Sequence, residues 1–449
     1  MTNIATAIND APLVQPEDIC DRIEDHTLTA IEIARLKTMN KDYIHVSVGG
    51  KQRIVMLKPC VVNGETHSFE SIGEFQGYFL HQDKIARMNA GIAWLKWKGK
   101  RFKPAGIGFY PSNDCPDNVF NLYQGVKVTP DGSKSCDIYL KHLENVICDG
   151  DQEAFQYLVG WLAHLIQKPE EKPSVAIVMK SVEGTGKGTM VHPLLQILGA
   201  HGVQINGAGQ IGGRFNATME NKLLVFADEV DLTHPATANK FKGLISESVI
   251  NLERKGIDPE PMPNYSRFIF ASNHENVIKA GLRERRYLVL EPNPDKAQNS
   301  AYFDHLWKWI KEGGGASALL YYLQHLDISE FKPNKAPVTK ALITEKLDSL
   351  RPAEKFMYER LLEERPFMGK NLLSATELVD DFIDWNETNI ENISPSQARS
   401  LIGKLLSRMK FSVKGRSDRG SGKYYEVGQT EDWRRRFSEM LGDDISVLF

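Results

Sequence analysis

A glycine-rich segment near the middle of the chain has the residue types of a loop that binds phosphate groups. Backbone amides of such a turn converge on an anion, the N-terminus of a following helix adds positive potential, and a lysine adds a full charge. Lys187 is the expected catalytic lysine of this loop. We expect nucleotide phosphates to be bound by Glu183, Gly184, Thr185, Gly186, Lys187, Gly188 and Thr189.

The loop departs from the strict G-x-x-x-x-G-K-[ST] pattern of phosphate-binding loops. Ser181 stands where that pattern has its first glycine, and Gly188 stands where it has a hydroxyl. The next hydroxyl belongs to Thr189, so we expect Thr189 to face Mg²⁺ if any hydroxyl of the loop does. Taken alone, a glycine–lysine pair is equally compatible with an ordinary turn, and the residues downstream must decide.

Two carboxylates, Asp228 and Glu229, follow an apolar run over residues 223–227. Such a run is typical of a buried parallel strand, whose carboxyl end lies beside the ligand in open α/β sheets. We expect Asp228 to hold Mg²⁺ through water and Glu229 to polarise the attacking water. An acidic pair after a strand is more often a solvated turn, but its position about forty residues after the lysine favours catalysis.

A further apolar strand over residues 266–272 ends in Asn273. An amide both donates and accepts, so Asn273 could orient the lytic water or contact the terminal phosphate. The alternative is a turn-forming asparagine at a strand end.

An arginine cluster with Arg285 and Arg286 leads into the next strand, residues 287–290. Arginine stabilises charge on a transferring phosphoryl group, often from a neighbouring subunit. We expect Arg286 to do so here, with Arg285 as the second candidate. Taken alone, an arginine cluster would more often be a solvated face.

A β-hairpin is predicted in the second half of segment 240–256, with Arg254 and Lys255 at its tip. Charged residues at such a tip suit a sequence-independent contact with a nucleic acid backbone. An ordinary exposed turn is the alternative.

The order of these motifs resembles that of the superfamily 3 helicases of viruses, phages and plasmids. Within them it is most similar to the helicase part of the phage and plasmid primase-helicases, which are related to the poxvirus type. The resemblance covers residues 153–292. It implies an AAA+-type P-loop ATPase fold, ATP with Mg²⁺ as cofactors, and a hexameric ring that translocates on single-stranded or forked DNA.

The same resemblance assigns roles to two residues. It implies that Arg286 acts on the nucleotide of a neighbouring subunit and that Lys255 touches DNA. Loops of the GTGKGT type occur in that family, so the displaced hydroxyl at Thr189 is compatible with ATP.

The elements that must position these residues are predicted from hydrophobic periodicity. An apolar run over residues 175–179 predicts the strand before the loop, and an amphipathic run from Met190 to Leu198 predicts the helix after it. Another amphipathic helix, over 153–167, opens an ATPase domain that we place at residues 151–330. The fold class is therefore α/β.

Residues 1–150 predict a small α+β domain with a hairpin around Gly49 and Gly50. The segment 94–103 alternates basic and aromatic residues, which suits a nucleic-acid surface but more often marks an edge strand with solvated lysines. No paired carboxylates typical of a polymerase or primase metal site stand out here. A primase or polymerase, if needed, is therefore expected to be a separate partner protein.

Residues 331–449 predict a helical domain that ends like a winged helix. Capping boxes at 374–377 and 394–397 each begin a helix, and a basic hairpin follows with Arg416, Arg419 and Lys423. Such a module grips duplex DNA in some proteins and contacts other proteins in others, and both alternatives stay open.

Composition excludes several classes of protein. The chain has 449 residues, a net charge of −3, 41% hydrophobic and 25% charged residues, so any nucleic-acid site must be a local patch. Its five cysteines include no C-x-x-C pair and predict reduced thiols. No signal pattern and no apolar run of roughly 20 residues occurs, so we expect a cytoplasmic protein without a membrane span.

The leading expectation is an ATP-dependent replicative DNA helicase of a phage, prophage or plasmid. The alternative is an ATP-controlled, origin-binding initiator or loader without processive unwinding. A small-molecule P-loop kinase is a third hypothesis. The Asp228–Glu229 pair, Asn273 and the arginine cluster suit attack by water better than transfer to a bound acceptor.

Overall fold

The protein is described from a computed structural model. It divides into two compact units, Met1–Val126 and Lys127–Phe449. The sequence placed this boundary at residue 150. In the structure the helical turns at residues 137–147 instead pack against α5 and α6 of the second unit. The described residues are 23–24, 27–58, 67–112, 114–207, 217–252, 260–274, 277–278, 284–364, 366–369, 372–389, 393–411, 424–426, 429–442 and 445–449.

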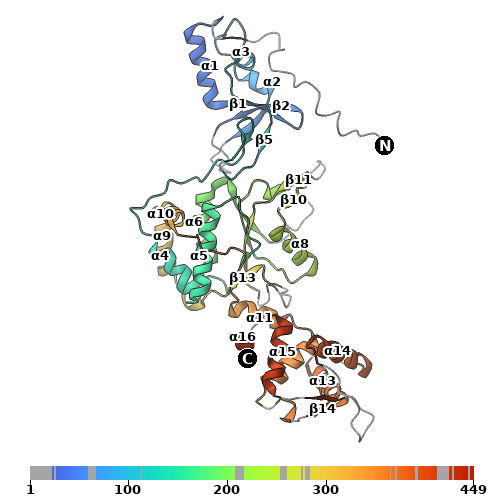
Figure 1. The fold of residues 1–449 in the computed structure, drawn as a ribbon. Helices are drawn as coiled ribbons and strands as arrows, with labels where there is room; N and C mark the ends of the chain where they lie inside the picture. Colours follow the sequence, from blue (N-terminus) through green and yellow to red (C-terminus); the bar gives the residue numbers. More distant parts are fainter. Residues whose placement is uncertain are drawn as a thin grey trace, which may run out of the picture. The chain divides into compact units, whose positions relative to one another are not determined.

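The first unit is built on a small sheet in the order β3-β2-β1-β4 (Figure 1). The predicted hairpin is confirmed, because β1 and β2 pair antiparallel around Gly49 and Gly50. These glycines have φ of 55° and 73°, which a two-residue turn of this kind requires. Its elements are α1 (Ala30–Asp42), β1 (Tyr43–Val48), β2 (Lys51–Met56), β3 (Ser68–Ser71), α2 (Ile72–Gly77), α3 (Ala90–Lys96), β4 (Phe102–Lys103), β5 (Ile107–Gly108) and β6 (Phe120–Asn121).

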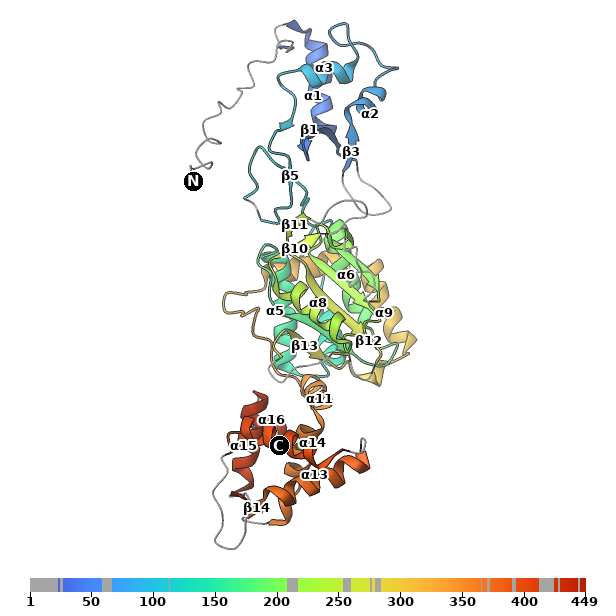
Figure 2. The same cartoon turned by 90° about the vertical axis from the view of Figure 1, so that its right-hand side faces the viewer.

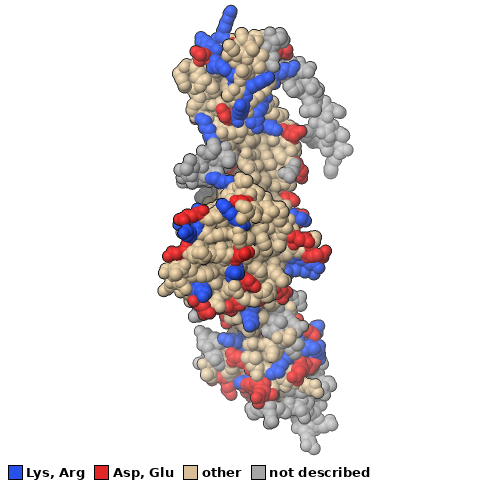
Figure 3. All heavy atoms as spheres, turned by 90° about the vertical axis from the view of Figure 1, so that its left-hand side faces the viewer, with Lys and Arg blue, Asp and Glu red and all other residues tan. Residues whose placement is uncertain are grey.

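The basic and aromatic segment 94–103 agrees only in part with the edge-strand interpretation, because β4 lies at the edge of the sheet. Its first residues end helix α3, and only Phe102–Lys103 form a strand. Trp94 and Trp97 are 0% and 2% exposed and belong to the core of the unit, so their rings are not available to stack on bases. The cations remain at the surface, and Lys and Arg side chains gather over this unit (Figure 3).

The second unit contains a five-stranded parallel sheet in the order β13-β7-β12-β9-β8. Alternate residues of each strand face opposite sides, so both faces are apolar, as the continuous hydrophobic runs in the sequence predicted. The strands are β7 (Ala176–Lys180), β8 (Gly202–Asn206), β9 (Leu224–Asp228), β12 (Arg267–Ser272) and β13 (Tyr287–Leu290).

Helices cover both faces of this sheet. The helices α5 and α6 lie on one side and α8 lies on the other (Figure 1), and α8 is seen in front of the strands in the turned view (Figure 2). Phe241 of α8 packs on Phe268 and Phe270 of the central strand. The helices are α4 (Asp137–His142), a π-helix (Leu143–Ile147), α5 (Gln152–Gln167), α6 (Lys187–Leu198), α8 (Pro235–Ser246), α9 (Ser300–Lys311), α10 (Gly315–His325) and α11 (Lys340–Asp348).

The C-terminal part has its own core, which includes Phe356 and Trp433. Both predicted capping boxes are present, at Ser374–Glu377 and Ser394–Gln397. The strands β14 and β15 pair antiparallel, and the winged helix itself stays a prediction. Its elements are α12 (Pro352–Leu362), β14 (Leu372–Ser374), α13 (Ala375–Asn389), α14 (Pro395–Arg408), β15 (Tyr424–Glu426), α15 (Thr430–Leu441) and α16 (Ile445–Leu448).

Arg416, Arg419 and Lys423 lie outside the described residues. The cysteines within the described ranges, Cys115, Cys136 and Cys148, are free thiols. Among the helices that the structure describes, none is both long and apolar enough to span a membrane.

Candidate phosphate-binding site

The carboxyl ends of three neighbouring strands bring the candidate residues to one edge of the sheet. Lys180 of β7 lies opposite Ser272 of β12, and Phe270 of β12 lies opposite Ala227 of β9. Because the strands are parallel and in register, the residues that follow them leave the sheet side by side. The glycine-rich loop, Asn273 and the Asp228–Glu229 pair therefore surround the same space.

Glycine is required at two positions of the loop. Gly184 and Gly186 have φ of 78° and 90°, a conformation that other residues rarely adopt. A Cβ atom on Gly186 would also lie 2.6 Å from Cε1 of His142 and 2.7 Å from Cε1 of Phe303. The loop backbone thus passes directly beneath side chains of α4 and α9.

Helix α6 begins at Lys187, and its N-cap residue Gly186 provides no side-chain acceptor. The first bond of the helix runs from the amide of Met190 to the carbonyl of Gly186. The amides of residues 187–189 therefore have no partner within the helix and lie at its positive end. This is the arrangement of backbone donors that binds phosphate groups.

Lys187 is only 8% exposed, and neutral oxygen atoms enclose its ammonium group. Among the residues that the structure describes, no carboxylate forms a direct ion pair with Lys187, which suits an anionic ligand. Its acceptors are the carbonyl of Ser181 at 2.7 Å, the hydroxyl of Ser181 at 3.2 Å, the carbonyls of Val182 and Ser272 at 3.3 Å, and Asn273 Oδ1 at 2.5 Å.

Burial lowers the pKa of Lys187, because a desolvated ammonium is less stable than a solvated one. The carboxylates of Asp228 and Glu183 oppose this effect. Asp228 is thus close enough to act on the loop lysine electrostatically, as the predicted site requires.

The backbone between Asp228 and Glu229 is strained. Glu229 has a φ of 55°, which costs a residue with a side chain roughly 1–2 kcal/mol. Its amide donates to Asp228 Oδ1 at 3.0 Å, and the amide of Val230 rejoins β12 at the carbonyl of Ala271. Strain of this kind concentrates at functional sites, and here it leaves the Glu229 side chain exposed at the edge of the sheet.

The two residues after Lys187 differ from each other in their exposure to solvent. Thr189 is 5% exposed, whereas Gly188 is exposed and a Cβ atom there would meet nothing within 4 Å. Successive helical residues point about 100° apart, so the free space lies at position 188 and the hydroxyl lies toward the packed side of α6.

The described residues offer only a small number of protein ligands for a magnesium ion. They contain no group of three or more His, Cys, Asp or Glu side chains placed to hold a metal ion. Mg²⁺ is commonly held by one or two carboxylates together with water and substrate phosphates. Asp228 is compatible with that pattern as the carboxylate, whereas a role for the buried Thr189 hydroxyl stays a prediction.

The structure does not bring Arg285 and Arg286 to the loop of the same chain. Tyr287, the first residue of β13, lies opposite Ala176, the first residue of β7, so Arg286 precedes the sheet at the edge opposite the loop. The length of the strands puts roughly 15–20 Å between the two edges. Arg286 Nε donates to Ser246 Oγ at 2.9 Å, and its Nη1 lies 3.4 Å from Glu284 Oε1.

The predicted hairpin is confirmed in its stem, where β10 (Val249–Leu252) pairs antiparallel with β11 (Glu260–Pro263). The Asn264 side chain donates to the carbonyls of Leu244 and Glu247 at 2.9 and 3.0 Å, which fixes the base of the hairpin to the end of α8. Arg254 and Lys255 at its tip lie outside the described residues.

His142 and Phe303 contact the loop but were not recognised in the sequence. His142 Nδ1 lies 2.9 Å from the Tyr302 hydroxyl, and its Nε2 lies 3.4 Å from the carbonyl of Gly186. Burial lowers the pKa of His142 to about 4, so the ring is neutral near pH 7. No local pattern could have identified these residues, because α4, α6 and α9 are far apart in the sequence.

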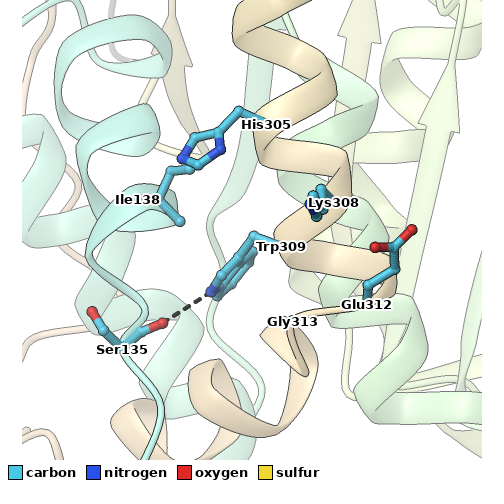
Figure 4. Close-up of a pocket in the computed structure, with 7 residues that line it drawn as sticks. All are labelled: Ser135, Ile138, His305, Lys308, Trp309, Glu312 and Gly313. Atoms are coloured by element: carbon cyan, nitrogen blue, oxygen red, sulfur yellow. Dashed lines mark hydrogen bonds between the residues drawn. The ribbon is translucent and has the colours of Figure 1, made fainter.

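A separate cavity of about 520 Å³ lies between the beginning of α4 and the end of α9 (Figure 4). Trp309 points into it and donates from Nε1 to the carbonyl of Ser135 at 2.9 Å. None of the predicted site residues lines it, so we do not associate it with the phosphate loop. Its lining residues are Ser135, Ile138, His305, Lys308, Trp309, Glu312 and Gly313.

Helix α14, in the C-terminal part, has an exposed basic face on which two cations stand among small residues. Arg399 and Lys404 are exposed there and line a hollow of about 610 Å³ together with Arg351. The nearby Arg408 is already paired with the buried carboxylate of Glu354. The exposed residues of this face are Ser396, Arg399, Ser400, Gly403, Lys404 and Ser407.

Comparisons with known proteins match the chain to a family of unknown function and to a phage DNA primase-polymerase. A family of unknown function, DUF5906, matches residues 179–286, which include the loop, the acidic pair, Asn273 and Arg286. The chain is 25% identical over 279 residues to the DNA primase-polymerase of Nitratiruptor phage NrS-1. That match covers 60% of this chain but only 38% of the phage protein.

Solved structures of the apo C-terminal region of NrS-1 have a similar fold. They superpose with TM-scores of 0.63 and 0.64 at 16% identity, and the match covers 87% of this chain and 97% or 98% of theirs. At this level of identity the likeness concerns the mixed α/β fold alone.

Proposed function

We propose that the protein is an ATP-dependent DNA helicase of a phage or plasmid replication system. The observation that supports this most strongly is the set of strand ends around Lys187. Its buried ammonium is held by neutral oxygens, with Asn273 beside it and Asp228 near enough to act on its charge. A buried cation without a direct counterion is costly to maintain, and an anionic ligand would offset that cost.

Each residue of the site has a role in this proposal. Bound ATP with Mg²⁺ supplies the transferable phosphoryl group and a cation that offsets its charge. Lys187 exchanges the carbonyl of Ser181 for phosphate oxygens, while the amides at the start of α6 bind the same anion. Asp228 and Thr189 would hold the metal, and Glu229 and Asn273 would orient and polarise the attacking water.

The position of Arg286 favours an assembly of several subunits. An arginine at the edge opposite its own loop can contact a phosphoryl group only in a neighbouring copy of the chain. We therefore include in the proposal a closed ring, with six subunits as in the resembling helicases. Such a ring would present the β10–β11 hairpin, with Arg254 and Lys255, to a single strand of DNA.

The similarity to a phage DNA primase-polymerase supports DNA as the partner. The basic face of α14 would supply a second contact, with duplex DNA near a fork. A separate primase or polymerase is the expected protein partner. The same α14 face also fits the alternative function, in which ATP controls an origin-binding initiator or loader that does not unwind processively.

The test is ATP hydrolysis with and without DNA, measured together with displacement of an annealed strand from a forked duplex. For a helicase we expect DNA-stimulated hydrolysis coupled to strand displacement. For a loader we expect hydrolysis without strand displacement. Lys187→Ala should abolish hydrolysis, whereas Lys308→Ala, which changes an exposed lysine on α9, should leave it intact. Normal hydrolysis by Lys187→Ala would contradict both functions.

A further inference from the structure

Helix α11 joins the sheet to the C-terminal part and packs with a different side on each. Ala341 and Leu342 belong to the core beneath the sheet, whereas Ile343 and Leu347 pack against the C-terminal core. At about 100° per residue these two pairs point to nearly opposite sides of the helix. A displacement of either part would therefore move α11.

One carboxylate, that of Glu345, is buried on the side of α11 that faces the sheet. It is 1% exposed, and its helical position lies between those of Ala341 and Leu342. The amide of Val277 donates to Glu345 Oε2 at 3.2 Å, and the amide of Ile278 donates to the same oxygen at 3.1 Å.

The other oxygen of Glu345 meets a lysine. Lys180 Nζ lies 3.2 Å from Glu345 Oε1, and the two side chains are 12% and 1% exposed. Burying a carboxylate is costly unless it is paired and hydrogen-bonded, and Glu345 has both an ion pair and two backbone donors. Such a fully satisfied buried group fixes the relative positions of the segments it joins.

Both segments lead directly into the candidate site. Lys180 is the last residue of β7 and precedes Ser181, whose carbonyl and hydroxyl accept from Lys187. Val277 and Ile278 follow the Asn273 end of β12, and the carbonyl of Val277 accepts from the amide of Leu232, close to Glu229. Glu345 thus connects the loop, the Asn273 strand and the acidic segment to one helix.

We propose that Glu345 is a positioning residue that couples the phosphate loop to the C-terminal part through α11. It touches no reacting group itself. It holds the start of the loop and the chain after Asn273 at a fixed separation, and it passes any shift of either to the helix. The catalytic part of this inference rests on the proposed ATP hydrolysis, whereas the structural link does not.

The first measurement is hydrogen exchange of the full-length protein without nucleotide. Glu345→Ala should speed exchange of the Val277 and Ile278 amides by about tenfold or more, because it removes their acceptor. Glu345→Gln keeps one side-chain oxygen that can accept from these amides, so it should recover part of the protection. The matched control is Asp348→Ala, which removes an exposed carboxylate from the same helix and should change neither amide.

The second measurement compares kcat for ATP hydrolysis with Kd for a fluorescent ATP analogue. Glu345→Gln should lower kcat by about tenfold to a hundredfold, because small misplacements of catalytic groups have effects of this size. Its Kd should change little, since the loop amides and Lys187 remain. In the wild type, a non-hydrolysable ATP analogue should alter exchange in α11 and α12, and Glu345→Gln should abolish that response.

Each outcome decides a distinct part of the inference. Unchanged exchange at Val277 and Ile278 in Glu345→Ala overturns the link. If the alanine variant does not fold, a response of α11 and α12 to the ATP analogue in Glu345→Gln that equals that of the wild type overturns it. Equal loss of kcat and affinity would indicate general destabilisation and also overturn it. If the wild type neither binds nor hydrolyses ATP, the proposed function fails, while the exchange experiment without nucleotide still decides the link.

Discussion

Lys187 Nζ donates a hydrogen bond to Asn273 Oδ1 at 2.5 Å, which joins the glycine-rich loop to the end of the neighbouring strand β12. The acceptor is a neutral amide, so the bond orients the ammonium without neutralising it. The Nδ2 group of the Asn273 amide is a donor, and Asn273 lies at the exposed edge of the sheet. The pair therefore presents a full positive charge and an oriented amide to the same space.

Replacing Asn273 tests that relationship. Asn273→Asp puts a carboxylate beside Lys187, which neutralises the ammonium and repels phosphate, so we expect weaker ATP binding and loss of hydrolysis. Asn273→Ala should lower kcat by about a hundredfold with nearly normal binding, since it removes an oriented group but adds no charge. Equilibrium binding of a fluorescent ATP analogue and steady-state hydrolysis distinguish the two variants. Normal hydrolysis by both would remove Asn273 from the site.

Mixed assemblies test whether Arg286 acts on a neighbouring subunit. Arg286→Ala should lower kcat by about a thousandfold, because an arginine that stabilises the transferring phosphoryl group has effects of at least that size. Lys187→Ala should be inactive on its own. An equal mixture of the two variants should recover part of the activity, because some interfaces then pair an intact loop with an intact arginine.

Arg285→Ala is the matched comparison in the same experiment, since Arg285 is the exposed neighbour. A larger loss in Arg285→Ala than in Arg286→Ala would exchange the two assignments. A mixture as inactive as its components, in protein shown by light scattering to be a ring, would contradict action between subunits.

The hydroxyl that faces Mg²⁺ can be found by substitutions at two adjacent positions. Thr189→Val should raise the Mg²⁺ concentration for half-maximal hydrolysis by about tenfold, if its buried hydroxyl is a metal ligand. Gly188→Ser introduces a hydroxyl where the structure has free space, so it should fold normally and restore part of the activity of Thr189→Val. An unchanged Mg²⁺ requirement in Thr189→Val would remove Thr189 from the metal site.

Stability should fall as the solution becomes acidic, in part because of His142. Burial lowers its folded-state pKa to about 4, whereas an unperturbed histidine has a pKa of about 6.5. Above pH 6.5 both states are neutral and the full stability is present. Between pH 6.5 and 4 only the unfolded chain binds the proton, so this residue alone costs up to roughly 3 kcal/mol by pH 4.

Urea unfolding at several pH values measures this loss. The substitution His142→Gln should reduce the slope of the unfolding free energy against pH. His45 and His164 also have pKa values lowered to about 4 by burial, so part of the slope should remain. An unaltered slope in His142→Gln would show that His142 does not titrate as the geometry indicates.

The basic face of α14 should contribute to binding of duplex DNA. Arg399→Ala combined with Lys404→Ala should weaken binding and reduce the slope of log affinity against log salt by about two. Lys355→Ala, which removes an exposed cation from α12, is the control and should change neither by a comparable amount. Equal effects in both variants would mean that α14 has no specific role.

Much of the candidate site could be predicted from short stretches of sequence. The loop, the Asp228–Glu229 pair and Asn273 each follow an apolar run, and parallel strands necessarily bring such ends to one edge. The capping boxes at Ser374 and Ser394 were also predictable, because a cap involves residues only three apart. These features depend on neighbours in the chain.

Other predictions failed or stayed incomplete because composition does not determine which side of a segment is buried. The mixture of rings and cations at 94–103 favoured an edge strand with solvated lysines over a nucleic-acid surface, but it gave no sign that tertiary packing places Trp94 and Trp97 in the core. The loop pattern predicted that Thr189 faces Mg²⁺ if any hydroxyl of the loop does, but it did not indicate that packing of α6 buries Thr189 and leaves Gly188 exposed.

The sequence by itself determined the chemistry that is available at the loop and the apolar runs whose ends present it. Only the tertiary structure decided what surrounds that chemistry: His142 and Phe303 over Gly186, Arg286 at the opposite edge, and Glu345 between Lys180 and the chain after Asn273. The reason is physical. Periodicity and capping report interactions within a few residues, whereas these contacts join helices and strands whose separation in the sequence says nothing about their separation in space.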